Sequence, residues 1–443
     1  MKTTSSYAVE IKQVNKVLRG TVAIYNSAVS MCVDIFEKEW DTLKTLDTIN
    51  RKGLCDKLIH GTSKREAKYP CFDEAFYKMP AYLRRSAIAH ALGYLSSYHS
   101  NLENWENDLR KKHSEKTPAL QRCLHKCPTF YNAEMFASEG IDSDLAKIKI
   151  YKDNDWVWLP IQLKHTDMQY IRKHLTGKKM SAPVLEHKHH KWFLRFSFES
   201  ESKLNNTPIN EQTILAVDLG INTDATCSVM RSDGTILARK FINFASDKDH
   251  LWHTLNKIKR QSKENGSYST TRLWNYARRC NEELARKIAR SISDYALEMQ
   301  VDTIVFEHLD IKGKKRGFRK ERLQMWRKNS VQDIVEGKAH RAGIRIRRVC
   351  AWNTSRLAFD GSGEILRGKD AGFQSNKMCR FSNGKIYNCD LSASYNIGAR
   401  YFIGQKEKTI SVKKWSDIVA KVPECAKRSR CVYATLLQIN KVA

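Results

Sequence analysis

Hydrophobic side chains recur every three or four residues through the first third of the chain, which is the spacing of an amphipathic helix. One such face comprises Val14, Leu18, Tyr25, Val29, Cys32 and Phe36. A second face begins after Pro80, and proline is favoured in the first turn of a helix. This second face comprises Ala87, Ala91, Tyr94, Tyr98, Leu102, Trp105 and Leu109. We expect long helices here, with aromatic side chains that pack in a core rather than bind a ligand.

Near residue 145 the pattern changes to the alternation of half-buried strands. The clearest example is residues 191–199, whose apolar positions are Trp192, Leu194, Phe196 and Phe198. Segments 147–150 and 156–163 also look extended, and residues 7–11 have the pattern of a further strand. The sequence therefore predicts a small β-barrel or sheet over about 145–205, to which the N-terminal strand is added.

From residue 211 onward, strands and a helix follow one another. Strands are predicted over 213–217, 226–230, 237–243 and 301–306, and a long amphipathic helix precedes the last of them, with its apolar face over 284–299. This order suits an α/β layer fold.

Three acids stand where these elements begin or end. Asp218 and Glu307 each end an apolar strand, and Asp390 opens an expected helix. Carboxylates in such buried places are costly unless something neutralises them. Three hard oxygen ligands suit Mg²⁺, and two such ions would activate a water and stabilise the leaving oxygen in phosphodiester hydrolysis.

Each acid alone has a simpler explanation. A strand-end Asp before Leu-Gly is also a turn former, and the same tripeptide follows a strand in actin-like ATPases. Those ATPases need further glycine-rich phosphate loops, and none is obvious in this sequence. The combination of three acids, the order of the elements and the charge favours the metal-dependent interpretation.

The 443 residues carry 77 Lys and Arg against 48 Asp and Glu, a formal net charge of +29. Such an excess predicts a surface that binds a polyanion, either nucleic acid or an anionic membrane. We find no amphipathic basic anchor and no membrane-spanning apolar run. Residues 1–13 lack the apolar core of a signal peptide, and the 12 cysteines form no disulfide framework. We therefore expect a cytoplasmic protein, associated with the nucleoid when it acts, with no membrane partner.

Two basic clusters adjoin these elements. Residues 311–348 hold fourteen Lys and Arg, and those nearest the second acid are Lys312, Lys314, Lys315, Arg316, Arg319 and Lys320. Such a run is usually a solvated face, but its position favours guiding single-stranded DNA. In the second cluster, over residues 257–287, Arg272, Arg278 and Arg279 occur together with Trp274 and Tyr276, which suits phosphate contact and base stacking.

The acid motifs resemble those of a split RuvC nuclease domain. They are Ala-Val-Asp-Leu-Gly-Ile at 216–221, Phe-Glu-His-Leu at 306–309, and Asp390 followed by Asn396-Ile397. Their order and spacing are similar to the TnpB family of transposon-encoded proteins and to the compact type V CRISPR effectors. Segments 191–198, 338–344 and 353–355 resemble the same family. The resemblance covers about 150–404, and residues 12–145 match it only as a helical region in the corresponding position.

The resemblance implies a multidomain α+β protein with an RNase H-like (RuvC) nuclease domain. Residues 1–11 would give the first strand of a β-barrel domain, 12–145 a helical recognition domain and 146–210 the wedge-like β-barrel. Residues 211–349 would hold the first two nuclease motifs, 350–389 a degenerate zinc-finger insertion that loads the target strand, 390–404 the third motif and 405–443 a basic tail.

The resemblance also implies an activity. Asp218, Glu307 and Asp390 would be the catalytic, Mg²⁺-binding acids of an RNA-guided DNA endonuclease. Its partners would be a guide RNA and double-stranded DNA with a displaced single strand, selected by pairing next to a short motif. Two alternatives stay open: an RNA-guided protein that acts by occupancy, as in transcriptional repression, and a guide-independent nuclease. Either a transposon or a CRISPR locus would suit the sequence.

The sequence departs from the family at the zinc finger. The positions of its two Cys-x-x-Cys pairs are Ala358, Gly361, Cys379 and Ser382. One thiolate does not close a zinc site, so we expect no zinc and a loop that keeps its shape by hydrogen bonds and packing. Regrouping of Cys350, Cys379 and Cys389 around a metal is an alternative without any paired chelate.

Two further groups have metal-ligating residue types. His187, His189 and His190 lie at an expected hairpin turn, and Cys123 and Cys127 flank His125. We interpret the first as exposed turn residues and the second as reduced thiols. In the third acid motif, Ser392 stands where the family usually has Asn.

Overall fold

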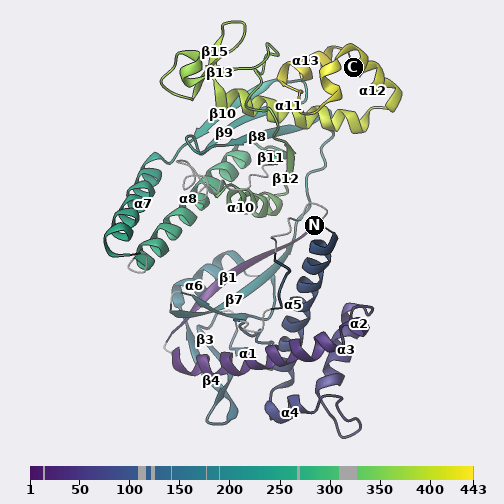
Figure 1. The fold of residues 1–443 in the computed structure, drawn as a ribbon, viewed down its shortest axis with the longest axis vertical. Coiled ribbons are helices and arrows are strands. Elements are labelled where there is room, and N and C mark those ends of the chain that lie inside the picture. The colour runs from purple at the N-terminus through teal and green to yellow at the C-terminus, as the bar shows by residue number, and fades with distance from the viewer. Residues whose placement is uncertain are drawn as a thin grey trace. The chain divides into compact units, whose positions relative to one another are not determined.

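The computed structural model describes residues 1–12, 15–107, 116–120, 125–140, 142–175, 177–188, 190–266, 270–308 and 327–442. The chain forms two compact units (Figure 1), one of Lys2–Ser200 and one of Glu201–Ala443 together with Met1. Both mix helices and strands, which confirms the predicted α+β class in its broad sense. Among the described residues, no helix is long and apolar enough to cross a membrane.

The N-terminal unit begins with the predicted helices. They are α1 (Asn15–Lys38), the short α2 (Trp40–Leu43), α3 (Thr48–Ile59), α4 (Cys71–Ala75) and α5 (Ala81–Asn107). The predicted face of α1 is fully buried from Leu18 to Phe36, whereas Val14 lies outside the described residues. On α5 the predicted face is buried at Ala87 and Ala91 and half-buried from Tyr94 to Trp105.

A seven-stranded sheet completes this unit, in the order β2-β3-β4-β1-β7-β5 with β6 paired to β7. Its strands are β1 (Lys2–Lys12), β2 (Phe136–Ser138), β3 (Leu145–Lys152), β4 (Asp155–Leu163), β5 (Lys179–Met180), β6 (Val184–Lys188) and β7 (Lys191–Glu201). The predicted N-terminal strand and the alternation over 191–199 are confirmed. Helix α6 (His165–Leu175) follows β4 and was not predicted.

Helices and sheet of this unit share one hydrophobic cluster, in which Val29 and Phe36 of α1 and Ile148 and Phe198 of the sheet take part. The predicted histidine turn lies between β6 and β7, where His190 has a positive φ of 63°. His189 and Cys123 lie outside the described residues. Cys127 is half-buried, and burial raises the pKa of its thiol.

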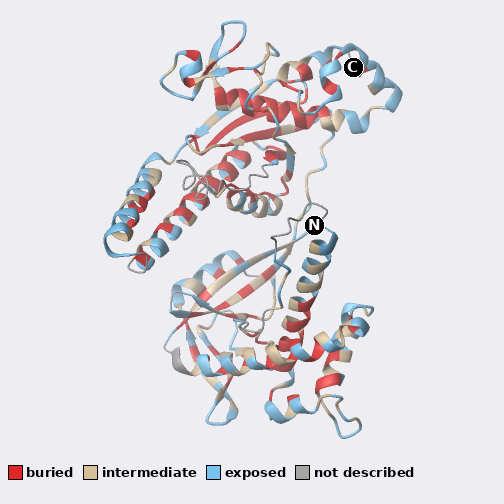
Figure 2. Ribbon diagram, in the orientation of Figure 1, coloured by how far each residue is buried: buried red, intermediate tan, exposed pale blue. Residues whose placement is uncertain are grey.

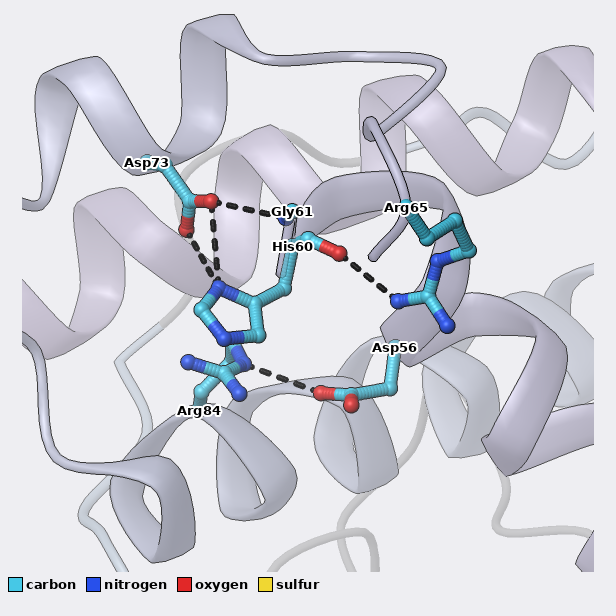
Figure 3. A network of polar contacts seen from close by, with 6 residues as sticks. All are labelled: Asp56, His60, Gly61, Arg65, Asp73 and Arg84. Carbon is cyan, nitrogen blue, oxygen red and sulfur yellow. Dashed lines mark hydrogen bonds and ion pairs between the residues drawn. The ribbon is translucent and has the colours of Figure 1, made fainter. Parts of the chain in front are cut away.

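A polar network fastens the loop after α3 to its neighbours (Figure 3). Asp73 of α4 accepts a hydrogen bond from the amide of Gly61 at 3.0 Å and lies 3.0 Å from Nδ1 of His60. Arg65 donates to the carbonyl of His60 at 2.8 Å, and buried Arg84 of α5 donates to Asp56 at 2.9 Å. Two of these bonds satisfy backbone groups of the loop, the amide of Gly61 and the carbonyl of His60.

The second unit is built on a five-stranded sheet in the order β10-β9-β8-β11-β12. Its strands are β8 (Thr213–Leu219), β9 (Ala225–Arg231), β10 (Ile236–Ile242), β11 (Thr303–His308) and β12 (Arg345–Cys350). Strands β8, β11 and β12 are parallel, and β9 and β10 are antiparallel to their neighbours. Four of the strands match the predicted ones, and β12 was not predicted.

Helices cover both faces of this sheet (Figure 1). One face packs on α8 (Thr271–Glu298) and α10 (Lys328–Arg341), and α7 (Ala245–Asn265) packs against α8. The other face packs on α11 (Cys389–Thr409), which α12 (Val412–Lys421) and α13 (Tyr433–Val442) cover in turn. Residues 391–403 of α11 are all buried (Figure 2), as expected for a helix enclosed on every side.

Candidate active site

Two of the three predicted acids lie side by side at the carboxyl ends of neighbouring parallel strands. Val217 of β8 pairs with Phe306 of β11, so Asp218 and Glu307 follow at matching positions. Ala216 and Val305 face the cluster on the α11 side, whereas Val217 and Phe306 face the opposite side. Because side chains alternate along a strand, both carboxylates project toward the face that α11 covers.

The third acid lies in the first turn of α11. Asn388 caps this helix by accepting a hydrogen bond from the amide of Leu391 at 2.9 Å. Further along, Gly398 lets α11 approach the sheet, since a Cβ there would lie 3.3 Å from Cβ of Ala216. The helix therefore brings Asp390 to the edge of the sheet at which β8 and β11 end and at which Asp218 and Glu307 lie.

The other two carboxylates act electrostatically on Asp218. Burial raises the pKa of Asp218 well above its ordinary value, and the charges of Glu307 and Asp390 raise it further, while Arg367 opposes the shift. Burial also raises the pKa of Glu307, which is 7% exposed. Each of these effects penalises the ionised form, so a cation between the carboxylates would lower the free energy of the site.

Polar groups surround Glu307. Thr354 Oγ1 donates a hydrogen bond to Glu307 Oε1, and Gln332 Nε2 donates to the backbone carbonyl of Glu307 at 3.1 Å. The Thr354 bond and the charge of buried Arg400 partly offset the rise in the pKa of Glu307. These three partners were not predicted, although the segment that contains Thr354 was noted for its resemblance.

The donor set fits a hard divalent cation. Asp and Glu carboxylates are the ligands that Mg²⁺ prefers, and Mg²⁺ commonly keeps several waters and takes only one or two carboxylates from the protein. Among the described residues, no group of three or more His, Cys, Asp or Glu side chains lies close enough together to hold a metal ion by itself. The chemistry of the carboxylates fits Mg²⁺, with waters and phosphate oxygens completing its coordination.

A pH-dependent stability difference follows from the raised pKa of Asp218. A carboxyl whose pKa is higher in the folded than in the unfolded protein makes folding less favourable as pH rises. The loss begins near the unfolded pKa of 3.8 and ends above the folded pKa. We expect the metal-free Asp218→Asn variant to have the melting temperature of the wild type near pH 4 and a higher one at pH 8. The increase should be about 2–4 °C for each kcal/mol gained in the free energy of unfolding. Thermal unfolding in EDTA measures this, and an equal difference at both pH values would contradict it.

The insertion at 351–388 is held by packing and hydrogen bonds. It contains a three-stranded sheet of β13 (Leu366–Arg367), β14 (Met378–Arg380) and β15 (Ile386–Asn388). Two predicted zinc-finger positions, Ala358 and Cys379, join an apolar cluster with Phe381. At the other two, Gly361 adopts a φ of 81°, and Ser382 Oγ donates to the carbonyl of Glu364 at 3.4 Å. Cys389 belongs to the same cluster, and Cys350 is exposed.

Of the two sets of basic residues that the sequence predicts to contact nucleic acid, the structure describes one. The first set (Lys312, Lys314, Lys315, Arg316, Arg319 and Lys320) lies outside the described residues. The second set, Arg272, Arg278 and Arg279, is exposed on the first half of α8. Trp274 and Tyr276 beside it are 38% and 41% exposed.

A cleft of about 1070 Å³ opens at the carboxyl end of β8 within the described part of this unit, and Asp218, Glu307 and Asp390 are not among its lining residues. Its lining begins at Leu219 and Gly220 and continues along α7 and α8, with Trp252 among its apolar members. Its basic residues are Lys248, Lys259, Arg327, Lys328 and Lys377. The cleft thus combines apolar and basic side chains. This combination suits a nucleic-acid strand, because the bases can stack on apolar groups and the phosphates can contact cations.

The site and fold define a mixed α+β protein with one buried and two half-buried acids at one edge of a sheet, and with a cleft that contains basic residues in the same unit. Residues 4–152 match the Aq_aa04 family. The chain is 23% identical to the TnpB-like protein aq_aa05 of Aquifex aeolicus (strain VF5) over 201 residues, which are 41% of this chain and 65% of that protein. It is thus a distant TnpB-like homologue that spans less than two thirds of this relative.

Solved structures with a similar fold include two RNA complexes. A Cas12f1–sgRNA–target DNA complex matches with a TM-score of 0.47 and 16% identity, over 86% of this chain and 81% of that one. An AacC2c1–sgRNA binary complex matches with a TM-score of 0.44 and 10% identity, over 87% of this chain and 70% of that one.

Proposed function

We propose that the protein is an RNA-guided DNA endonuclease with a single RuvC-like site formed by Asp218, Glu307 and Asp390. The observation that carries the proposal is the convergence of these acids at one edge of the five-stranded sheet, where the other two carboxylates raise the pKa of Asp218. The strand order, in which β9 alone runs opposite to the other four strands, supports an RNase H-like domain. Similarity to a TnpB-like protein supports RNA guidance.

Asp218, Glu307 and Asp390 would hold Mg²⁺ at this edge. When bound, the cation supplies Lewis-acid stabilisation of charge on the phosphate oxygens. The protein contributes the position of the three carboxylates, the buried surroundings of Glu307 and the neutralising charge of Arg367 near Asp218.

The cleft along α7 and α8, which opens at the carboxyl end of β8, would hold part of the nucleic-acid substrate. Exposed Arg272, Arg278 and Arg279 would contact phosphates, and Trp274 and Tyr276 would stack on bases. We assign the same strand-guiding role to the basic residues of 311–320. The insertion at 350–389 would load the target strand.

The N-terminal unit would bind the guide RNA and read a short motif beside the target. Its helices and seven-stranded sheet share one core, which supports a rigid platform for an RNA–DNA duplex read by shape. The chain has 77 Lys and Arg against 48 Asp and Glu, and this excess of positive charge supports binding to the phosphates of a guide RNA and a DNA target.

Purification from the native host tests guidance. We expect a discrete RNA to co-purify and the complex to cut a plasmid that carries the matching target, with Mg²⁺ present. Absence of any bound RNA contradicts the proposal. Cleavage without RNA would support a guide-independent nuclease, and target binding without cleavage would support action by occupancy.

A further inference from the structure

We infer that Thr354 is a positioning residue for Glu307, and that Asn396 and Arg400 of α11 hold Thr354 in place. This inference rests on the proposed function, because it concerns how one of the three carboxylates is oriented toward a cation. The Thr354 side chain is buried with 1% exposure, and its hydroxyl donates to Glu307 Oε1. A bond to one oxygen restricts rotation of the carboxylate plane and so selects which lone pairs point toward the site.

Asn396 of α11 holds the loop that contains Thr354. This side chain is fully buried, and its Nδ2 donates to the carbonyls of Thr354 and Leu357, each at 3.0 Å. Its Oδ1 accepts from the amide of Tyr433 at 3.0 Å. Asn396 therefore fixes the backbone on which Thr354 stands and ties it to the start of α13.

Arg400 lies one turn further along α11 and secures the start of the same loop. Its Nη1 donates to the carbonyls of Cys350 and Trp352, each at 2.7 Å. Its Nε and Nη2 donate to the carbonyls of Cys431 and Ser429 at 2.9 and 3.0 Å. The loop is thus held at both ends by α11, the helix that also carries Asp390.

This arrangement couples two of the acids through one rigid element. Asp390 lies in the first turn of α11, and the side chains that hold the Thr354 loop follow from the same helix. Outer partners that orient a metal ligand typically contribute about 10–100-fold to metal affinity or activity. Thr354 should contribute in this range, through its hydroxyl rather than through its volume.

The test compares Thr354→Val, Thr354→Ala and Thr354→Ser in the full chain with its co-purified RNA. Thr254→Val is the matched control, because its buried hydroxyl donates only within α7, to the carbonyl of His250 at 2.9 Å. Mn²⁺ binding is followed by electron paramagnetic resonance titration, and the Mg²⁺ dependence of plasmid cleavage is measured alongside. Thermal unfolding checks that each variant is folded.

We expect Thr354→Val and Thr354→Ala to bind Mn²⁺ about 10–100-fold more weakly and to need correspondingly more Mg²⁺ for cleavage. Thr354→Ser should restore both values, and Thr254→Val should leave them unchanged. Wild-type Mn²⁺ affinity in both hydroxyl-free variants, or failure of serine to rescue, would overturn the role of Thr354. If the wild type binds Mn²⁺ but cuts no DNA, the proposed function fails while the Mn²⁺ comparison still decides the inference; if it binds no Mn²⁺, both fail.

Discussion

Asp218→Ala is expected to abolish Mg²⁺-dependent cleavage while binding of the guide RNA and target stays near normal. Asp218 is the acid that both other carboxylates influence, so its removal dismantles the shared cation site. Stabilisation of transition-state charge by a cation is worth several kcal/mol, and its loss should reduce the rate by at least about 10³-fold. A plasmid cleavage assay and a gel-shift assay on the same RNA complex measure the two properties.

Asp417→Ala provides the matched control, because Asp417 is an exposed acid of α12 in the same unit. It removes an equal charge and should cleave like the wild type. Asp218→Ala also removes a half-buried carboxylate whose ionised form is penalised in the metal-free protein, so a loss of cleavage cannot be attributed to unfolding if the melting temperature is unchanged or higher. Cleavage by Asp218→Ala at the wild-type rate would refute the assignment of the site.

The strand-end acids could be predicted because the signal is local. A run such as Ile214 to Val217 identifies a buried strand, and an acid directly after it contradicts the apolar pattern. The parallel pairing of β8 with β11 then brings two such ends together. Asp390 was recognisable from its motif and from the helix that follows it.

The polar support of the site could not be predicted in the same way. Thr354, Gln332 and Arg400 come from three segments, and no local pattern relates any of them to Glu307. Arg400 in particular interrupts an apolar helix and reads as a surface charge until the helix is seen to be enclosed. Such partners become visible only when the tertiary structure brings separate segments together.

The insertion illustrates the opposite case, in which the sequence indicates what is missing but not what replaces it. The sequence alone shows that three of the four zinc-binding thiolates are missing. The apolar cluster of Ala358, Cys379 and Phe381 could not be predicted, because it depends on the pairing of β14 with β15. Residues 405–443 were expected as a basic tail, and the structure describes helices α12 and α13 within this range. Ile418 of α12 and Leu436 of α13 pack in the cluster around α11.

Arg400→Met should destabilise the second unit more than any other single change in the support of the site. The guanidinium is 4% exposed and donates to four backbone carbonyls from two segments. Methionine fills a similar volume but leaves these carbonyls without their donor and removes the positive charge that favours ionised Glu307. A buried carbonyl left without its hydrogen-bond donor costs about 1–3 kcal/mol.

Hydrogen exchange measures this cost locally, because two compact units need not unfold together. Amides of 350–357 and 429–433 should exchange faster in Arg400→Met, and those of the N-terminal unit should be unchanged. Arg400→Lys keeps the charge but loses the planar set of donors. Its amide exchange rates should therefore lie between those of the wild type and those of Arg400→Met. Arg290→Met is the control, since Arg290 is 76% exposed on α8 and should change stability by less than about 0.5 kcal/mol. Equal exchange in Arg400→Met and Arg290→Met would mean that α11 does not secure the Thr354 loop, and the link between Asp390 and Glu307 through this helix would have to be abandoned.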